Sequence, residues 1–396
     1  MAKISKKIAT LAALAASAAC VTGQTYSPET DPFFQSPSGF EVYAPGSILR
    51  QREVPYSLNV TYSKAYQLLY RTNNALGGAD VSVTTVIVPK NVTSNALVSI
   101  QQPEDASYIR CAPSYTLHET TDTMVQAILD LGIVVNYPDY EGQDSAFTAG
   151  IQSGQMTLDS IKAALQTTNA TGVNRQSPVV MWGYSGGSIA TGWAAELRSV
   201  YAPDLELAGA AVGGLVNNMT AEITTLNGGP NSGFLPASLS GLSKAYPQFG
   251  QAVQSYLLPQ YTEQMAAVDS MCVAEDLQRY QNTDVLTWFS IGKDFLNLPV
   301  AQQVMSRNIM GEYTPDIPML VYEGARDEIV PVETVDNIVS TFCNDGAKIT
   351  YYRDPDTNHT ETAVKGFGLA VKWLGQALQG APVTNCTTIQ GPLPTQ

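Results

Sequence analysis

The sequence predicts an α/β fold with a mostly parallel central sheet, helices on both faces of that sheet and an inserted group of helices. Three observations support this prediction: short, almost wholly apolar runs of strand length, helical patterns between them, and one long connection that interrupts the alternation. Strands that are apolar on both faces are typical of a parallel sheet that helices cover on both sides.

Seven runs rich in β-branched residues have the length of buried strands. In chain order they are Val81–Pro89, Ala96–Pro103, Gly132–Tyr140, Pro178–Ser185, Leu207–Gly214, Pro318–Gly324 and Ala347–Asp354. Helical patterns between or after them cover Thr120–Leu131, Met156–Leu165, Gly187–Val200 and Thr362–Leu378. The alternation of the two patterns indicates strand–helix–strand units and therefore parallel strands.

The long connection lies between the strand candidates Leu207–Gly214 and Pro318–Gly324. From 216 to 313 roughly a hundred residues separate two strand candidates, far more than the usual few. This segment carries its own amphipathic stretches, so we expect a helical cap or lid. The domain prediction is a core formed by 23–215 and 314–396, with the cap at 216–313.

The first 22 residues predict a secretory signal peptide, because three lysines precede a short apolar stretch that ends in small residues. That stretch is too short to span a bilayer, and no later segment has about 18 consecutive apolar residues. A membrane anchor is the rival interpretation of the same segment. We expect a secreted, extracellular monomer with no transmembrane segment.

The net charge is −14 with the lysines of the leader included, and it falls to −17 without Lys3, Lys6 and Lys7. Such an acidic protein would be repelled by phosphates, so nucleic acid is not expected as a partner.

Only two histidines are present, and they are far apart in the sequence. No metal site and no cofactor are therefore predicted.

Four cysteines remain once Cys20 is removed with the leader, namely Cys111, Cys272, Cys343 and Cys386. In a secreted chain four cysteines indicate two disulfides, and the count alone leaves three pairings open.

Six Asn-X-Ser/Thr sequons are consistent with a secreted glycoprotein. They begin at Asn59, Asn91, Asn169, Asn218, Asn358 and Asn385.

One motif predicts chemistry. The strand candidate that ends at Ser185 runs into Gly-Tyr-Ser-Gly-Gly, and a helical pattern follows at once. A Gly-x-Ser-x-Gly sequence between a strand and a helix is typical of a nucleophile elbow, whose glycines let strand and helix approach closely. The alternative is a plain glycine turn. The elbow interpretation makes Ser185 the candidate nucleophile for attack on a carbonyl group.

A serine nucleophile needs a base and an orienting acid. His359 follows the strand candidate Ala347–Asp354, whereas His118 lies upstream of the serine and is interpreted as a surface histidine. Hydrolases of this architecture place serine, acid and histidine in that order. Asp327 follows the strand candidate Pro318–Gly324 and is the predicted acid, in preference to Glu328, which we expect to point away.

The oxyanion hole needs two donors. The amide of Gly186, which follows the nucleophile, is the first. The second should come from the loop after the strand candidate Ala96–Pro103, where the residue pattern leaves Glu104, Asp105 and Ala106 open.

These pieces together resemble the secretory lipase family of fungi, the lipase A type. The resemblance covers nearly the whole chain after the leader. Besides the elbow it rests on DPFF, PGSILR, YRTNN, EDA, CAPSY, LNGGP and DEIVP, which begin at Asp31, Pro45, Tyr70, Glu104, Cys111, Leu226 and Asp327.

The resemblance implies an α/β-hydrolase fold with a helical cap. It implies hydrolysis of triacylglycerols and other carboxylic esters, at a lipid–water interface where the substrate is a lipid. It carries nucleophile, acid and base to Ser185, Asp327 and His359, and the oxyanion positions to Asp105 and Gly186. It also implies the disulfides Cys111–Cys272 and Cys343–Cys386.

Rival functions remain open at this stage. The same triad could transfer acyl groups to alcohols or cleave peptides. A hydrolase fold can also act as a secreted binding module without catalysis, although such proteins usually lack a triad residue. Here serine, acid and histidine occur in the expected order, which favours the esterase.

Overall fold

The structure is a computed structural model that describes residues 27–381, 383 and 385–394. The predicted signal peptide at 1–22 lies outside the described residues. In the described part of the chain no helix is long and apolar enough to cross a membrane.

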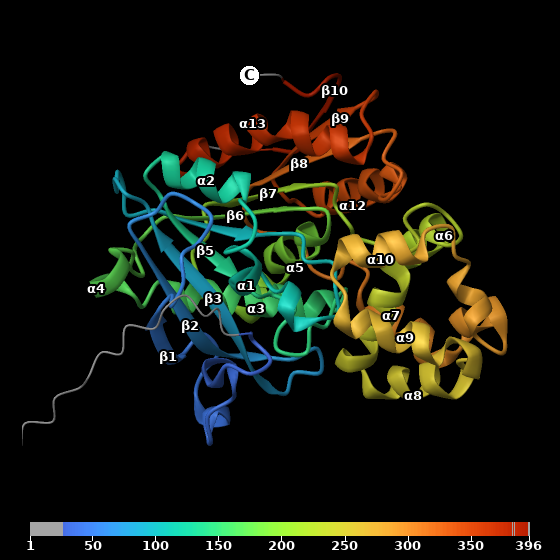
Figure 1. The fold of residues 1–396 in the computed structure, drawn as a ribbon. Helices are drawn as coiled ribbons and strands as arrows, with labels where there is room; N and C mark the ends of the chain where they lie inside the picture. Colours follow the sequence, from blue (N-terminus) through green and yellow to red (C-terminus); the bar gives the residue numbers. More distant parts are fainter. Residues whose placement is uncertain (1–26, 382, 384, 395–396) are drawn as a thin grey trace, which may run out of the picture.

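A ten-stranded mixed sheet forms the centre of the molecule (Figure 1). Its order is β1-β2-β3-β5-β4-β6-β7-β8-β9-β10, with antiparallel pairing from β1 to β5 and parallel pairing beyond β5. The strands are β1 Ile48–Glu53, β2 Lys64–Asn73, β3 Ala79–Val88, β4 Leu97–Gln101, β5 Val134–Pro138, β6 Val179–Tyr184, β7 Gly209–Gly213, β8 Met319–Gly324, β9 Ile349–Asp354 and β10 Thr387–Gln390.

Helices cover both faces of this sheet. One apolar cluster joins the sheet to α3 (Gly150–Ala164), α5 (Gly186–Tyr201) and α12 (Val332–Asn344). A second joins its other face to α2 (Thr123–Asp130) and α13 (His359–Leu378). Along β6 successive residues alternate between the two clusters, as the period of a strand requires. The prediction of a mostly parallel sheet with helices on both faces is confirmed.

The antiparallel part of the sheet was not predicted. β1 reads ILRQRE and is partly exposed, so it carries no apolar run. β2 lies between β1 and β3, pairs antiparallel with both and is largely buried, but polar residues interrupt its apolar positions. At the opposite edge of the sheet β10, which is short and wholly exposed, pairs parallel with β9 and was not predicted either. The edge strands β1 and β10 owe their conformation to hydrogen bonds with a neighbour rather than to apolar composition, so an apolar pattern does not reveal them.

Between β7 and β8 the chain forms a group of helices beside the sheet, drawn from green-yellow to orange in Figure 1. Two apolar clusters of its own hold it together, one around Phe295 and one around Trp288. Its helices are α6 Met219–Leu226, α7 Phe234–Ala245, α8 Pro247–Tyr256, α9 Thr262–Ala267, α10 Val273–Tyr280 and α11 Pro299–Arg307. The two remaining short helices of the core are α1 Pro113–Thr116 and α4 Thr168–Thr171.

Two disulfides are present in the described part of the chain. Cys111–Cys272 joins the segment before α1 to the residue that caps α10, and Cys343–Cys386 joins α12 to the segment before β10. The first therefore ties the inserted helices to the core, whereas the second ties the C-terminal strand to it.

Candidate active site

Ser185 stands at the turn from β6 to α5 in a strained backbone conformation. Its φ of 51° and ψ of −125° lie in a region that residues with a side chain rarely adopt. Its amide donates to the carbonyl of Gly213 at 3.0 Å, which anchors the turn to β7. The side chain is consequently held at the carboxyl edge of the parallel strands, where α/β folds place their sites.

The glycines on either side of the serine are required by close packing. A Cβ at Gly183 would lie 2.2 Å from the carbonyl oxygen of Gly187. One at Gly187 would lie 1.9 Å from the carbonyl oxygen of Gln101, at the end of β4. Any larger residue at these positions would separate the helix from the strands, which is the reason the motif needs glycine at both.

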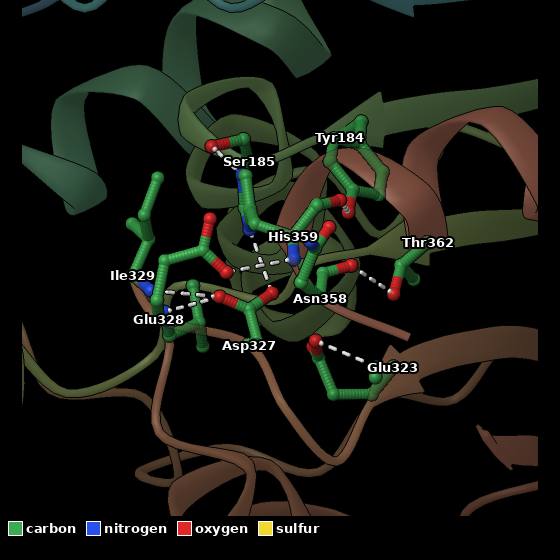
Figure 2. A network of polar contacts seen from close by, with 12 residues as sticks. Tyr184, Ser185, Glu323, Asp327, Glu328, Ile329, Asn358, His359 and Thr362 are labelled. Atoms are coloured by element: carbon green, nitrogen blue, oxygen red, sulfur yellow. Dashed lines mark hydrogen bonds and ion pairs between the residues drawn. The ribbon is translucent and has the colours of Figure 1, made fainter. Parts of the chain in front are cut away.

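His359 contacts both of its predicted partners (Figure 2). Its Nε2 lies 2.8 Å from the Ser185 hydroxyl, and its Nδ1 lies 2.6 Å from Asp327 Oδ2. The other carboxylate oxygen of Asp327 accepts the amides of Ile329 and Val330 at 2.9 and 2.8 Å. Serine, imidazole and carboxylate thus form one continuous hydrogen-bonded chain, with the acid held by backbone donors.

The environment keeps Asp327 ionised. Burial alone would raise its pKa, but the hydrogen bond and the charge of His359 outweigh burial and lower the pKa below the usual value. The neighbouring Glu323 is buried in β8, and burial together with the negative charge of Asp327 raises its pKa well above normal. Glu323 is therefore a neutral acid beside the charged Asp327.

Residues around the histidine differ from expectation in two ways. The helix begins at His359 rather than at Thr362, because Asn358 and Glu361 form a capping box. Glu328 does not point away, since its carboxylate accepts the backbone amide of His359 at 3.1 Å. With Tyr184, whose hydroxyl donates to the His359 carbonyl at 2.6 Å, it fixes the backbone of the histidine.

Of the three loop candidates, Asp105 lies beside Gly186 and lines the same pocket as Ser185. It is buried, its φ is 53°, and its Oδ1 lies 1.7 Å from where a Cβ of Gly186 would stand. Burial raises its pKa to about 6, with the charge of His359 opposing this rise. Gly186 is the first residue of α5, so its amide has no acceptor within the helix and lies at the positive end of the helix dipole.

A small, largely apolar pocket that is partly open to solvent lies beside the serine. The core and helices α6 and α7 both contribute to its wall. It is lined by Asp105, Phe147, Thr148, Ser185, Gly186, Ile189, Val216, Met219, Glu222, Leu226, Phe234, Leu235, Ser238 and Ile329. Glu222 was not predicted, because a single acid in a helical pattern resembles a surface residue.

The second histidine takes no part in this arrangement. His118 follows α1 in a turn and packs between the rings of Tyr56 and Tyr115. Among the residues that the structure describes, no three His, Cys, Asp or Glu side chains form a cluster suited to a metal ion.

Comparison with known families decides the assignment. The profile of the family described as Secretory lipase matches residues 112–386, well over half of the chain. The chain belongs to the Secretory lipase family.

Individual members of this family are similar along most of their length. Lipase A of Arthroderma benhamiae is 35% identical over 90% of this chain and 81% of its own. The trichothecene C-3 esterase of Fusarium sporotrichioides is 34% identical over 88% of this chain and 83% of its own. The closed structure of Candida antarctica lipase A superimposes with a TM-score of 0.85 at 28% identity, covering 94% of this chain and 92% of the other.

The expected resemblance is therefore confirmed, and the fold of this secretory lipase is that of the α/β-hydrolases. Relatives named as lipases and as an esterase identify the enzyme class as carboxylic ester hydrolase.

Proposed function

We propose that this secretory lipase hydrolyses carboxylic esters, triacylglycerols among them, through an acyl-enzyme formed on Ser185. The hydrogen-bonded chain from Ser185 through His359 to Asp327 is the observation that carries the proposal. In the first step His359 Nε2 takes the proton of the serine hydroxyl, and Oγ attacks the ester carbonyl carbon. Asp327 stabilises the imidazolium that results.

The developing oxyanion is stabilised by Gly186 and Asp105. The free amide of Gly186 donates directly, and removal of such a donor typically costs about 10²–10³ in kcat. Collapse of the tetrahedral intermediate breaks the ester C–O bond, and His359 returns its proton to the departing alcohol. A water molecule then repeats the sequence on the acyl-enzyme, which releases the acid and restores the serine.

The helices at 216–313 act as a cap over this site in our proposal. Phe234 and Leu235 on α7 line the pocket beside the serine and would contact the acyl chain. Trp288 and Phe289 instead pack in the interior of the inserted helices. We further propose that the chain is secreted as a monomer after removal of 1–22.

Replacement of the nucleophile tests the proposal. Ser185→Ala should lower kcat on p-nitrophenyl esters and emulsified triglyceride by about 10⁶ and abolish labelling by a fluorophosphonate. Ser255→Ala, an exposed serine on α8, is the matched control and should behave as wild type. Full hydrolysis by a folded Ser185→Ala protein would refute the proposed mechanism.

A further inference from the structure

The wall of the pocket beside Ser185 contains a carboxyl group that the proposed mechanism does not use. Glu222 lies on α6, its residue is only 4% exposed, and it lines the pocket with Met219 and Leu226. Neither of its carboxyl oxygens has a hydrogen-bond partner among the residues that the structure describes. A buried polar group without a partner costs free energy, so such groups are rare in folded proteins.

The other polar side chains of this wall outside the triad and oxyanion loop satisfy one another. The hydroxyls of Thr148 and Ser238 lie 2.7 Å apart and share a hydrogen bond. Glu222 is thus the side chain of this wall that keeps its full hydrogen-bonding capacity for a bound molecule. An apolar residue would fill the same place at less cost, which indicates a role in binding rather than in packing.

The chemical form of Glu222 defines what it can recognise. Burial raises its pKa to about 8, and the negative charge of Asp327 adds to the rise, so the group is a neutral acid at pH 7. A neutral carboxyl group presents one O–H donor and one carbonyl acceptor. A hydroxyl group also both accepts and donates, and it therefore complements both atoms at once.

We propose that Glu222 is a specificity-determining residue that favours esters whose acyl chain carries a hydroxyl group. This inference rests on the proposed function, because it assigns the acyl chain to the pocket beside the serine. An unsubstituted acyl chain would cover the carboxyl group of Glu222 without forming a hydrogen bond to it. A site built to hydrogen-bond a substrate hydroxyl discriminates against the analogue that lacks it, since its own polar group is then left unpaired.

The experiment compares matched esters on the mature enzyme. Values of kcat/KM are measured by titration of released acid for methyl hexanoate and for its analogues hydroxylated at the third or at the terminal carbon. Wild type should prefer at least one hydroxylated ester by about tenfold. Glu222→Met keeps the length of the side chain and should abolish this preference, mainly by faster hydrolysis of the plain ester. Glu222→Gln retains a donor and an acceptor and should preserve most of it.

A second buried acid supplies the control. Asp276 on α10 is 1% exposed and also lacks partners for its carboxyl oxygens, but it does not line the pocket. Asp276→Asn should leave the ratio of kcat/KM for the preferred hydroxylated ester to kcat/KM for methyl hexanoate unchanged. Equal ratios in wild type, Glu222→Met and Glu222→Gln would overturn the inference while ester hydrolysis itself persists. No hydrolysis of any ester by wild type would instead overturn the proposed function.

Discussion

Three residues that line the pocket, Asp105, Thr148 and Ser185, adopt backbone conformations with positive φ. Such positions typically cost about 1–3 kcal/mol each. The strain at Ser185 persists because β6 and α5 are both tightly packed, and it exposes the hydroxyl at the strand edge. At Asp105 it turns the carboxyl over Gly186, where an oxyanion would form. Backbone strain is thus concentrated where the proposed chemistry takes place.

The protonation of Asp105 should govern its contribution to catalysis. Below a pKa of about 6 its side chain is neutral and can donate to an oxyanion, whereas above it the carboxylate would repel one. Asp105→Asn donates at every pH. The ratio of wild-type to variant kcat should therefore fall at least about tenfold as the pH rises from 5 to 8.

The ratio isolates Asp105, because protonation of His359 affects both proteins. Rates on a soluble p-nitrophenyl ester at each pH provide the measurement. A ratio that stays constant across this range would show that the side chain of Asp105 does not donate, and would leave only its backbone amide in that role.

The parallel strands bring the site together, because their carboxyl ends lie at the same edge of the sheet. β6, β8 and β9 run parallel, so the segments after them deliver Ser185, Asp327 and His359 to one place. This much was predictable, because apolar runs mark the strands and chain order marks the partners. The support from Glu328 was not predictable, since it depends on how one turn folds back on the start of α13.

The disulfide Cys111–Cys272 should stabilise the attachment of the inserted helices. It spans 161 residues, and the chain-entropy model assigns a loop of this size about 5 kcal/mol, commonly less in practice. The double variant Cys111→Ser/Cys272→Ser should lower the apparent Tm by several degrees and speed proteolysis within 216–313. Calorimetry and mass spectrometry of the fragments measure both effects.

The second disulfide is the control for this prediction. Cys343→Ser/Cys386→Ser removes a bridge that spans 43 residues and joins α12 to the segment before β10. It should lower the Tm without speeding cleavage within 216–313. Equal cleavage in the two double variants would show that Cys111–Cys272 does not hold these helices to the core.

The molecule as a whole carries many acids in its interior. Burial is the main cause of a raised pKa at each of them, to about 6 at Asp80 and Asp159, about 7 at Asp139 and about 8 at Glu222. Burial also raises the pKa values of Glu104 and Glu141, near Asp105, well above normal, and the charges of nearby buried acids add to the rise. Repulsion among negative charges also increases as these groups ionise, toward the formal net charge of −14 that counts every carboxyl as ionised.

This distribution predicts a protein that is more stable in acid. A carboxyl whose pKa is higher in the folded than in the unfolded state binds more protons when folded, so the free energy of unfolding falls as the pH rises. Stability should be greatest near the unfolded pKa of about 4 and decline up to about pH 8.

Calorimetry at constant ionic strength measures this decline. The apparent Tm should drop by at least about 5 °C across that range, since a few kcal/mol correspond to several degrees. Asp139→Asn, which removes a group with a pKa of about 7, should flatten the upper part of the curve. A Tm that rises from pH 4 to pH 8 would contradict the prediction.

Local patterns along the chain were enough to predict the parallel strands, the elbow serine, its two partners and the inserted helices. The reason is that apolar periodicity, a glycine-flanked serine and chain order are all properties of neighbouring residues. Within the loop at 104–106 the residue pattern left three candidates open, and only the family resemblance chose Asp105. Folding alone revealed the antiparallel edge and the unpaired Glu222 beside the serine. These depend on contacts between segments far apart in the sequence, because partners and burial exist only once the segments pack together.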